Sequence, residues 1–505
     1  MKITEILTDI KIPDSIKDAD VSALSASPQG IDEGTLFFLT EGVNYEKQRL
    51  LPFILAKKPI AVVTSEKNAV KDACVPILYA ENARAAFAEA YFRFCGLDKS
   101  KMQYVAVTGT NGKTTTATML YEILHAEGIK TGFIGTGRMH INGKTLSSPY
   151  YSMTTPDPEI LYPALKEMDK AGCRAVVMEA SSHALKLHKL SPLSFDIAIF
   201  TNLSEEHLDF HANMEDYYLA KRSLFRRAKH AVLNADDPYA RRLAYECPCP
   251  VTRIGALFEG EVMAKSIEPR EDGGFSYIYK TEGPTFSVDL KLCGTYQIYN
   301  SMLALCAAIR LGIPPYRARR AIERLDTVAG RLECIAKEPI AVYLDYAHTP
   351  NALLSTLKNL CDIRTEEKKI WTVFGCGGER DRSKRPKMAS IAERLSDQVI
   401  LTLDNCREES PMQILHDTVQ GFQNPKSMRI VSNREKAIRY AVHAAADSDI
   451  LLIAGKGHEG YTIDKDGYHP FDERKIVLDA LKERKGGHTL LYENQTDKAL
   501  HGKGD

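Results

Sequence analysis

The chain has 505 residues, 44% of them hydrophobic and 26% charged, and its formal net charge is zero. This length exceeds a single hydrophobic core and predicts two to four domains. The balanced charge argues against nucleic-acid binding, and no apolar run is long enough to predict insertion into a membrane. The eleven cysteines lack the spacing of zinc sites or of a disulfide framework, so we expect a cytoplasmic protein with reduced thiols.

Three α/β domains are predicted, over residues 1–98, 99–330 and 331–505. Short apolar runs at 36–39, 60–63 and 75–78 predict the strands of a small first domain. Near-continuous apolar runs at 175–178 and 197–200 predict parallel strands that are covered on both faces. The alternating segment 274–292 predicts a small antiparallel excursion, and the polar tail after residue 485 is expected to be mobile.

A glycine-rich loop at 109–115 is the most specific motif of the second predicted domain. It follows an apolar run at 104–107 and precedes a helical pattern over 117–128. Glycines allow the backbone to approach phosphates, and the amides of a helix start attract anions. Lys113 is expected to contact the β- and γ-phosphates of a nucleotide, and Thr114 a magnesium ion. Val107 stands where the generic Walker pattern has its first glycine.

Four loops of the third predicted domain carry glycine or charge, and each follows a predicted strand. They are residues 345–350, 375–382, 404–411 and 455–459. Ligands bind at the carboxyl ends of the strands in open parallel sheets. We therefore expect these loops to share one edge and to form a site there.

Several further segments appear in an order that resembles the Mur ligases, in particular the branch that adds the third residue of the peptidoglycan stem peptide. The segments are Glu179–His183, Thr201–Ser204, His207–Asp209, Gly330–Glu333, Asp345–Pro350, Phe374–Gly378 and Gly455–Glu459. The resemblance covers residues 100–475. It implies a three-domain α/β architecture with a P-loop ATPase in the centre and a Rossmann-like C-terminal domain.

The resemblance also implies an activity and its small-molecule partners. ATP phosphorylates a carboxylate of the acceptor UDP-MurNAc-L-Ala-D-Glu, and the amine of a diamino acid then attacks the acyl phosphate. The cofactors are ATP and Mg²⁺, and the enzyme is expected to be a monomer. In such a reaction the protein mainly positions the reactants and neutralises charge.

Residue roles follow from the same motifs. Catalytic roles are expected for Lys113, Glu179, His207 and Lys221. ATP contacts are expected from Gly109, Thr110, Asn111, Gly112, Lys113, Thr114, Thr115, Asn300, Arg331 and Asp345. Magnesium ligands are expected in Thr114, Glu179 and His207. Contacts to the acceptor or the amino acid are expected from Thr154, Thr155, Ser181, Lys189, Arg380, Asp404, Asn405, Arg407, Gly455 and Glu459. Lys221 matches a lysine that family members carry as a carbamate; an exposed helix lysine is the competing interpretation.

The loop 404–411 bears on the choice of amino acid. The guanidinium of Arg407 could pair with the distal carboxylate of meso-diaminopimelate, which lysine lacks. Arg380 and Glu459 support that choice, whereas Cys406 and Ser410 depart from the pattern of diaminopimelate-adding relatives. L-lysine or another diamino acid remains the alternative.

The first domain departs from the family more strongly. Segment 25–29 reads Ser-Ala-Ser-Pro-Gln where a uridine-binding motif is expected, and Lys189 replaces an arginine, with the loss of bidentate anion binding. A paralogue that acts on a different acceptor therefore stays open. A folylpolyglutamate-type enzyme and a non-catalytic nucleotide-binding protein are the further alternatives.

Overall fold

The structure, a computed structural model, describes residues 1–40, 50–66, 74–146, 153–271, 273–424 and 428–485. The chain divides into two compact units, the first over 1–263 and 301–318 and the second over 264–300 and 319–505. Strand β13 (Val262–Pro269) and helices α9 (Tyr296–Arg310) and α10 (Pro315–Glu323) each cross the division. The expected boundaries after residues 98 and 330 stay predictions, and the expected mobile tail at 486–505 lies outside the described residues.

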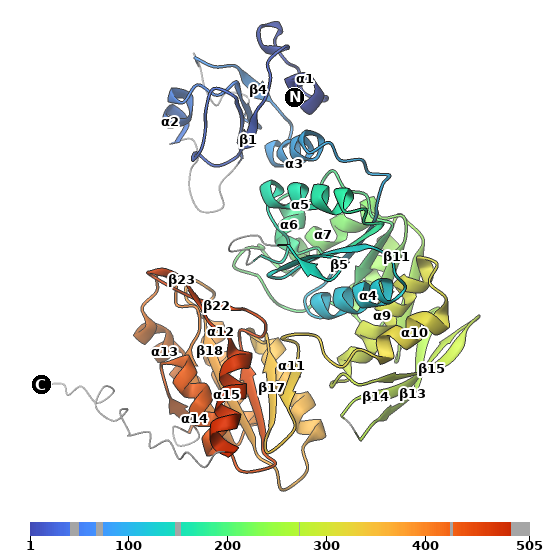
Figure 1. The fold of residues 1–505 in the computed structure, drawn as a ribbon, viewed down its shortest axis with the longest axis vertical. Coiled ribbons are helices and arrows are strands. Elements are labelled where there is room, and N and C mark those ends of the chain that lie inside the picture. The colour runs from blue at the N-terminus through green and yellow to red at the C-terminus, as the bar shows by residue number, and fades with distance from the viewer. Residues whose placement is uncertain (41–49, 67–73, 147–152, 272, 425–427, 486–505) are drawn as a thin grey trace, which may run out of the picture. The chain divides into compact units, whose positions relative to one another are not determined.

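The first unit begins with a four-stranded parallel sheet in the order β1-β2-β3-β4 (Figure 1). The strands are β1 (Ala23–Ser25), β2 (Thr35–Leu39), β3 (Ala61–Thr64) and β4 (Ile77–Tyr79). The helical elements are α1 (Ile3–Ile6), η1 (Asp14–Ile16), α2 (Leu51–Ala56) and α3 (Ala83–Phe94). Alternation along β2 sends Leu36 and Phe38 into one core cluster and Phe37 and Leu39 into another, so both faces of this small sheet are covered.

The large sheet of the first unit has the order β12-β11-β10-β5-β9-β6-β7-β8. Its strands are β5 (Gln103–Thr108), β6 (Thr131–Gly135), β7 (Arg138–Ile141), β8 (Lys144–Thr145), β9 (Ala175–Glu179), β10 (Ile197–Phe200), β11 (Ala231–Asn234) and β12 (Val251–Gly255). The six strands from β12 to β6 are parallel, and β7 and β8 are antiparallel to their neighbours.

The helices of this part lie between the strands in the chain. They are α4 (Lys113–Ala126), α5 (Pro158–Lys170), α6 (Ser182–Lys186), α7 (Met214–Arg222), η3 (Ser223–Arg227) and α8 (Pro238–Glu246). The runs predicted at 175–178 and 197–200 are the fully buried strands β9 and β10. The central β5 ends where the glycine loop begins, so this loop lies at the carboxyl edge of the parallel strands, where ligands bind in such sheets.

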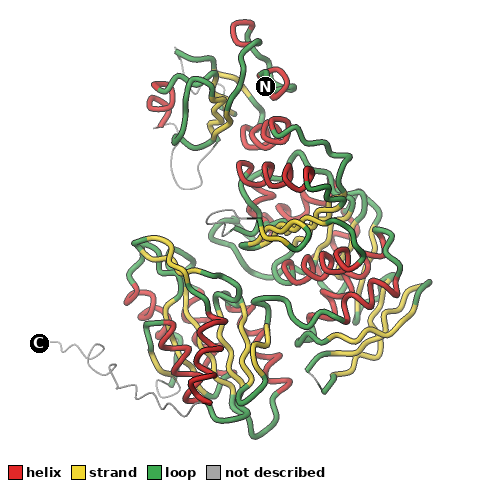
Figure 2. The backbone as a smooth tube through the Cα atoms, viewed as in Figure 1, coloured by secondary structure: helices red, strands yellow, loops and turns green. Residues whose placement is uncertain are grey.

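The second unit contains a six-stranded sheet in the order β16-β17-β21-β18-β19-β20. Its strands are β16 (Glu333–Ala336), β17 (Ala341–Asp345), β18 (Ile370–Cys376), β19 (Gln398–Leu403), β20 (Met428–Ile430) and β21 (Ile450–Ala454). All are parallel except β16. Figure 2 shows these strands in yellow beside red helices.

Helices cover both faces of this sheet. They are α11 (Pro350–Ile363), α12 (Lys384–Leu395), α13 (Pro411–Val419), α14 (Arg434–Ala444) and α15 (Glu473–Lys485). The first three share one core cluster, and α14 and α15 share a second one on the opposite face. This is the doubly wound arrangement expected for the C-terminal region, and it brings the carboxyl ends of β17, β18, β19 and β21 to one edge.

Two antiparallel hairpins complete the second unit. Strands β14 (Phe275–Thr281) and β15 (Thr285–Leu290) form the excursion predicted at 274–292. Strands β22 (Tyr461–Asp464) and β23 (Gly467–Pro470) follow the predicted loop 455–459. In the described part of the chain, no helix is both long and apolar enough to cross a bilayer.

Candidate active site

The glycine loop begins one residue after β5, and its glycines have specific backbone reasons. Gly109 has φ +148°, and a Cβ there would lie 1.9 Å from the Thr201 hydroxyl oxygen. Gly112 has φ +83° and precedes α4, whose start has no side-chain cap. Only glycine tolerates both conditions easily. Val107 is a buried residue of β5, so the turn starts later than in the generic Walker pattern.

Two lysine ammonium groups face the carbonyls of this loop. Lys113 Nζ donates to the carbonyl oxygens of Gly109 at 3.0 Å and Thr110 at 2.7 Å. Lys221, on α7, is 1% exposed, and its Nζ donates to the Gly109 carbonyl at 2.7 Å. Burial, reinforced by the charge of Lys113, holds the pKa of Lys221 well below its usual value. An amine in this environment loses its proton more readily than the amine of an exposed helix lysine does.

Glu179, at the end of β9, is the fully buried carboxylate of the same region. It accepts hydrogen bonds from the Thr114 hydroxyl at 3.0 Å and from the Thr136 amide at 2.9 Å. The described residues contain no cluster of three or more His, Cys, Asp or Glu side chains that could hold a metal. A hydroxyl beside a carboxylate nevertheless fits Mg²⁺, which typically binds one or two protein oxygens together with water and nucleotide phosphates.

His207 lies in the loop between β10 and α7 and has φ +58°. Its ring contacts those of His183 and Tyr217, with centroids 4.9 and 6.1 Å away. The Tyr217 hydroxyl lies 3.2 Å from the Thr110 hydroxyl, so His207 reaches the phosphate loop through Tyr217.

The residues expected to contact the acceptor lie together near Glu179. The Thr155 hydroxyl donates to the Glu179 carbonyl at 2.8 Å, and the Ser181 amide donates to the Thr155 hydroxyl at 3.0 Å. The Thr154 hydroxyl lies 3.1 Å from that of Thr136. Lys189 is 8% exposed and pairs with Asp157 at 2.8 Å. The ammonium therefore already has a carboxylate partner.

Asp345, Arg331 and Asn300 belong to the second unit in this division. Asp345 accepts from the Leu332 amide at 2.6 Å and from the Ala347 amide at 2.8 Å, so it fixes the loop that carries Arg331. Burial raises the pKa of the Asp345 carboxyl, while Arg331 opposes this. Asn300 is buried and donates from its amide to Gln297 at 3.0 Å. Contact of these three residues with ATP stays a prediction.

The predicted amino-acid loops converge on one buried ammonium. Lys456 Nζ is fully buried and lies 2.6 Å from Asn405 Oδ1 and 3.1 Å from Asp404 Oδ1. Asn405 Nδ2 donates to Glu459 at 3.1 Å. Burial opposes ionisation of Asp404, but Lys456 and Arg434 outweigh it and lower the pKa of that carboxyl to about 2. Gly455 permits this approach, because a Cβ there would lie 2.8 Å from Asp404 Oδ2.

Arg407 is half-buried with φ +54°, and Nη1 donates to the carbonyls of Gly378 at 2.7 Å and Asn405 at 3.3 Å. Its Nε and Nη2 have no partner among the described residues, so one edge of the guanidinium remains available to a carboxylate. Arg380 is exposed and has no ion pair within the described ranges. The structure thus brings Asn405, Arg407 and Glu459 into adjoining loops and leaves Arg380 at the surface.

Removal of the Lys456 ammonium should destabilise the second unit. Lys456→Met leaves Asp404 and Glu459 buried beside each other without this cation, which costs about 3–5 kcal/mol. Urea unfolding should show this loss, and the double variant Lys456→Met/Asp404→Asn should lose less than the sum of the single variants. Strictly additive losses would contradict a direct interaction between the two side chains.

Sequence reasoning missed Lys456, Tyr346 and His211 as members of these sites. Lys456 lies inside the predicted loop 455–459, but its partners are about fifty positions away. His211 follows the predicted His207 motif closely; its Nε2 lies 3.0 Å from the Ser182 hydroxyl, and its amide donates to the His207 carbonyl. In the sequence, only the closeness of His211 to His207 could have indicated that His211 belongs to this site.

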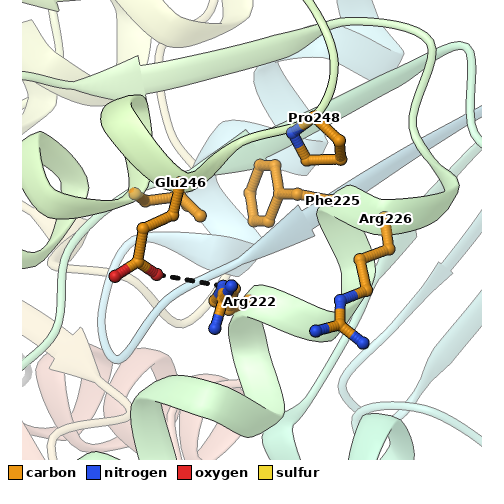
Figure 3. Close-up of a pocket in the computed structure, with 6 residues that line it drawn as sticks. Arg222, Phe225, Arg226, Glu246 and Pro248 are labelled. Carbon is orange, nitrogen blue, oxygen red and sulfur yellow. Dashed lines mark ion pairs between the residues drawn. The ribbon is translucent and has the colours of Figure 1, made fainter.

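A cavity of about 330 Å³ lies elsewhere in the first unit (Figure 3). It is lined by Arg222, Phe225, Arg226, Leu243, Glu246 and Pro248. Arg222 pairs with Glu246 at 3.0 Å across it. None of the predicted site residues lines this cavity, although Arg222 directly follows Lys221.

Comparisons with known proteins bear on the whole chain. The sequence profile of the Mur ligase middle domain matches residues 107–308, and that of the Mur ligase glutamate ligase domain matches residues 330–457. A protein of Geobacillus kaustophilus is 36% identical over 476 residues, which cover 92% of this chain and 96% of the relative. A protein of Chlorobaculum tepidum is 38% identical and covers 91% and 92%, respectively. Both relatives are named UDP-N-acetylmuramoyl-L-alanyl-D-glutamate–2,6-diaminopimelate ligase.

Solved structures show the same likeness. A structure of a ligase with that name is 29% identical, has a TM-score of 0.68, and covers 97% of this chain and 100% of its own. Folylpolyglutamate synthase of Mycobacterium tuberculosis, solved with ADP and AMPPCP, has a TM-score of 0.62 at 18% identity, with 80% and 95% covered. The second likeness concerns the fold alone.

Proposed function

Because this chain belongs to the Mur ligase family, we propose that it is an ATP-dependent ligase that joins meso-diaminopimelate to UDP-MurNAc-L-Ala-D-Glu in peptidoglycan synthesis. A carboxylate oxygen of the acceptor attacks the γ-phosphorus of ATP, and ADP leaves. The amine then attacks the acyl carbon of the resulting acyl phosphate, inorganic phosphate leaves, and the amine loses a proton. This assignment is carried by the likeness over nine-tenths of both chains to relatives named for this reaction.

In this proposal the first unit activates the carboxylate. Lys113 neutralises charge on the β- and γ-phosphates, and the helix start at α4 receives phosphate oxygens. Thr114, Glu179 and His207 would hold Mg²⁺, which lowers the charge repulsion between the phosphates and the carboxylate. Thr154, Thr155, Ser181 and Lys189 would contact the acceptor. Support comes from the short distances that connect Thr114, Glu179 and Thr155.

The second unit would receive the amino acid. Glu459 is the proposed acceptor for the distal ammonium, and Arg407 the partner of the distal carboxylate. Arg331, Asn300 and Asp345 are proposed to complete the ATP site. ATP and the UDP-linked acceptor are both found in the cytoplasm, so we propose that the enzyme works there. We also propose that it is a monomer.

Meso-diaminopimelate should be preferred strongly over L-lysine. A site built for a second carboxylate leaves the Arg407 guanidinium unpaired when lysine binds, which costs roughly 2–5 kcal/mol, or about thirtyfold to several-thousandfold in kcat/KM. Arg407→Ala should reduce the use of diaminopimelate far more than the use of lysine. The measurement is kcat/KM for diaminopimelate, lysine, ornithine and lanthionine.

The matched control is Arg364→Ala, because Arg364 forms an ion pair with Asp397 at 3.0 Å, away from these loops. This variant should keep the wild-type preference. A wild type that favours lysine or ornithine would contradict the role given to Arg407 while leaving the ligase assignment intact. Turnover with none of these amino acids would favour a paralogue with another acceptor, in line with the altered segment 25–29.

A further inference from the structure

Tyr346 lies where three loops of the second unit meet. It follows β17 directly, and its amide donates to the Gly330 carbonyl at 3.0 Å. Gly457 packs on its backbone, since a Cβ at Gly457 would lie 3.0 Å from both the Cβ and the amide nitrogen of Tyr346. The backbone of Tyr346 is thus held between the loop that carries Arg331 and the loop that carries Glu459.

The side chain of Tyr346 connects the same two loops. The Arg331 guanidinium carbon lies 4.7 Å from the centroid of the ring, within the range of a cation–π contact. The hydroxyl lies 3.1 Å from Glu459 Oε1 and donates to it. The His458 ring stacks on Tyr346, with centroids 5.5 Å apart and planes 27° apart, which limits rotation of the phenol.

We propose that Tyr346 is a positioning residue that couples occupancy of the amino-acid site at Glu459 to the nucleotide-contacting arginine, Arg331. This inference rests on the proposed function, because it takes Glu459 and Arg331 in their proposed roles. A phenol that donates to a carboxylate is rich in electron density, and it therefore attracts the guanidinium over its face strongly. A substrate ammonium at Glu459 competes for the carboxylate, weakens that hydrogen bond and loosens the hold of the ring on Arg331.

The coupling has a definite direction. When the ring holds Arg331 less tightly, the guanidinium turns more readily to a phosphate of ATP. Bound diaminopimelate should therefore strengthen the binding of ATP. Linkage then requires that ATP strengthens the binding of diaminopimelate by the same factor. A single weak contact modulates this coupling, so we expect a modest effect of about threefold to fivefold.

The test uses full-length enzyme and steady-state kinetics in which ATP is varied at low and at saturating diaminopimelate. In the wild type, the KM for ATP should fall about threefold to fivefold as diaminopimelate is raised. Tyr346→Phe keeps the ring under Arg331 but removes the hydroxyl, so the KM for ATP should no longer depend on diaminopimelate. The KM for diaminopimelate should not rise, because the hydroxyl no longer competes for Glu459. Tyr346→Leu removes the ring that holds Arg331, so at every diaminopimelate concentration the KM for ATP should stay near the low value that the wild type reaches at saturating diaminopimelate.

Tyr440 provides the matched control, because the Arg429 guanidinium carbon lies 4.3 Å from its ring centroid in the same unit. Tyr440→Phe and Tyr440→Leu should keep the wild-type dependence. A merely structural role of Tyr346 would lower thermal stability and kcat without changing how the KM for ATP responds to diaminopimelate. A wild type that turns over with no such response, or a Tyr346→Phe variant that keeps it, overturns the inference and leaves the ligase assignment standing. A wild type without turnover contradicts the proposed function instead.

Discussion

Lys113→Ala should abolish ATP-dependent ligation and leave the fold intact. The Lys113 ammonium donates to two carbonyls of its own loop, and its side chain is only half-buried, so little core packing is lost with it. During phosphoryl transfer the same ammonium would neutralise charge on the β- and γ-phosphates. Loss of such a contact costs on the order of 3 kcal/mol of barrier or more, about a hundredfold in rate.

The measurement is kcat at saturating ATP, with circular dichroism and thermal unfolding to show that the fold is kept. Lys229→Ala is the matched control, because Lys229 is a 73% exposed lysine of the same unit that pairs with Asp196. This control should retain full activity. Near-normal turnover of Lys113→Ala would remove the assignment of residues 109–115 as the phosphate loop.

Lys221→Ala should be at least about a hundredfold less active, because we propose that Lys221 works as a carbamate. The Lys221 nitrogen attacks CO₂, an N–C bond forms, and a proton leaves the nitrogen. Only the neutral amine reacts, and the lowered pKa of Lys221 supplies it at lower pH than an exposed lysine could. The product is an anion with two oxygens close to Lys113, suited to a magnesium-dependent site.

Three observations test this modification. Short-chain carboxylic acids should partly restore Lys221→Ala by supplying the missing anion. Lys221→Arg, which keeps the positive charge but forms no carbamate, should stay inactive. Carbon-13 NMR in labelled bicarbonate should show a carbamate signal in the wild type and not in Lys221→Ala. An active Lys221→Arg variant would show that a cation suffices.

The local patterns of the sequence predicted much of the fold. The apolar runs at 104–107, 175–178 and 197–200 became buried parallel strands because each run is apolar on both faces. The segment at 274–292 became an antiparallel hairpin, because polar and apolar residues alternate along it instead of forming a continuous apolar run. The helix after the phosphate loop begins at Lys113, earlier than the apolar pattern from residue 117 shows, because its first turn holds a lysine and three threonines rather than apolar residues.

The candidate sites were predicted as sets of loops rather than as contacts. The four charged loops could be assigned to one sheet edge because parallel strands place their carboxyl ends together. The role of Lys456 as the ion that holds Asp404 and Asn405 could not be predicted, because it depends on burial that no local pattern encodes. The link from Tyr346 to Glu459 spans 113 positions and depends in the same way on how the loops pack.

The most direct test of the proposed function follows an oxygen atom through the reaction. The acceptor UDP-MurNAc-L-Ala-D-Glu is prepared with ¹⁸O in the reacting carboxylate and incubated with enzyme, ATP, Mg²⁺ and meso-diaminopimelate. Mass spectrometry of the released phosphate should find one ¹⁸O atom per amide bond formed, because the carboxylate oxygen becomes the bridging oxygen of the acyl phosphate. Phosphate without ¹⁸O, or phosphate released without any amide product, would contradict activation of the acceptor carboxylate by ATP.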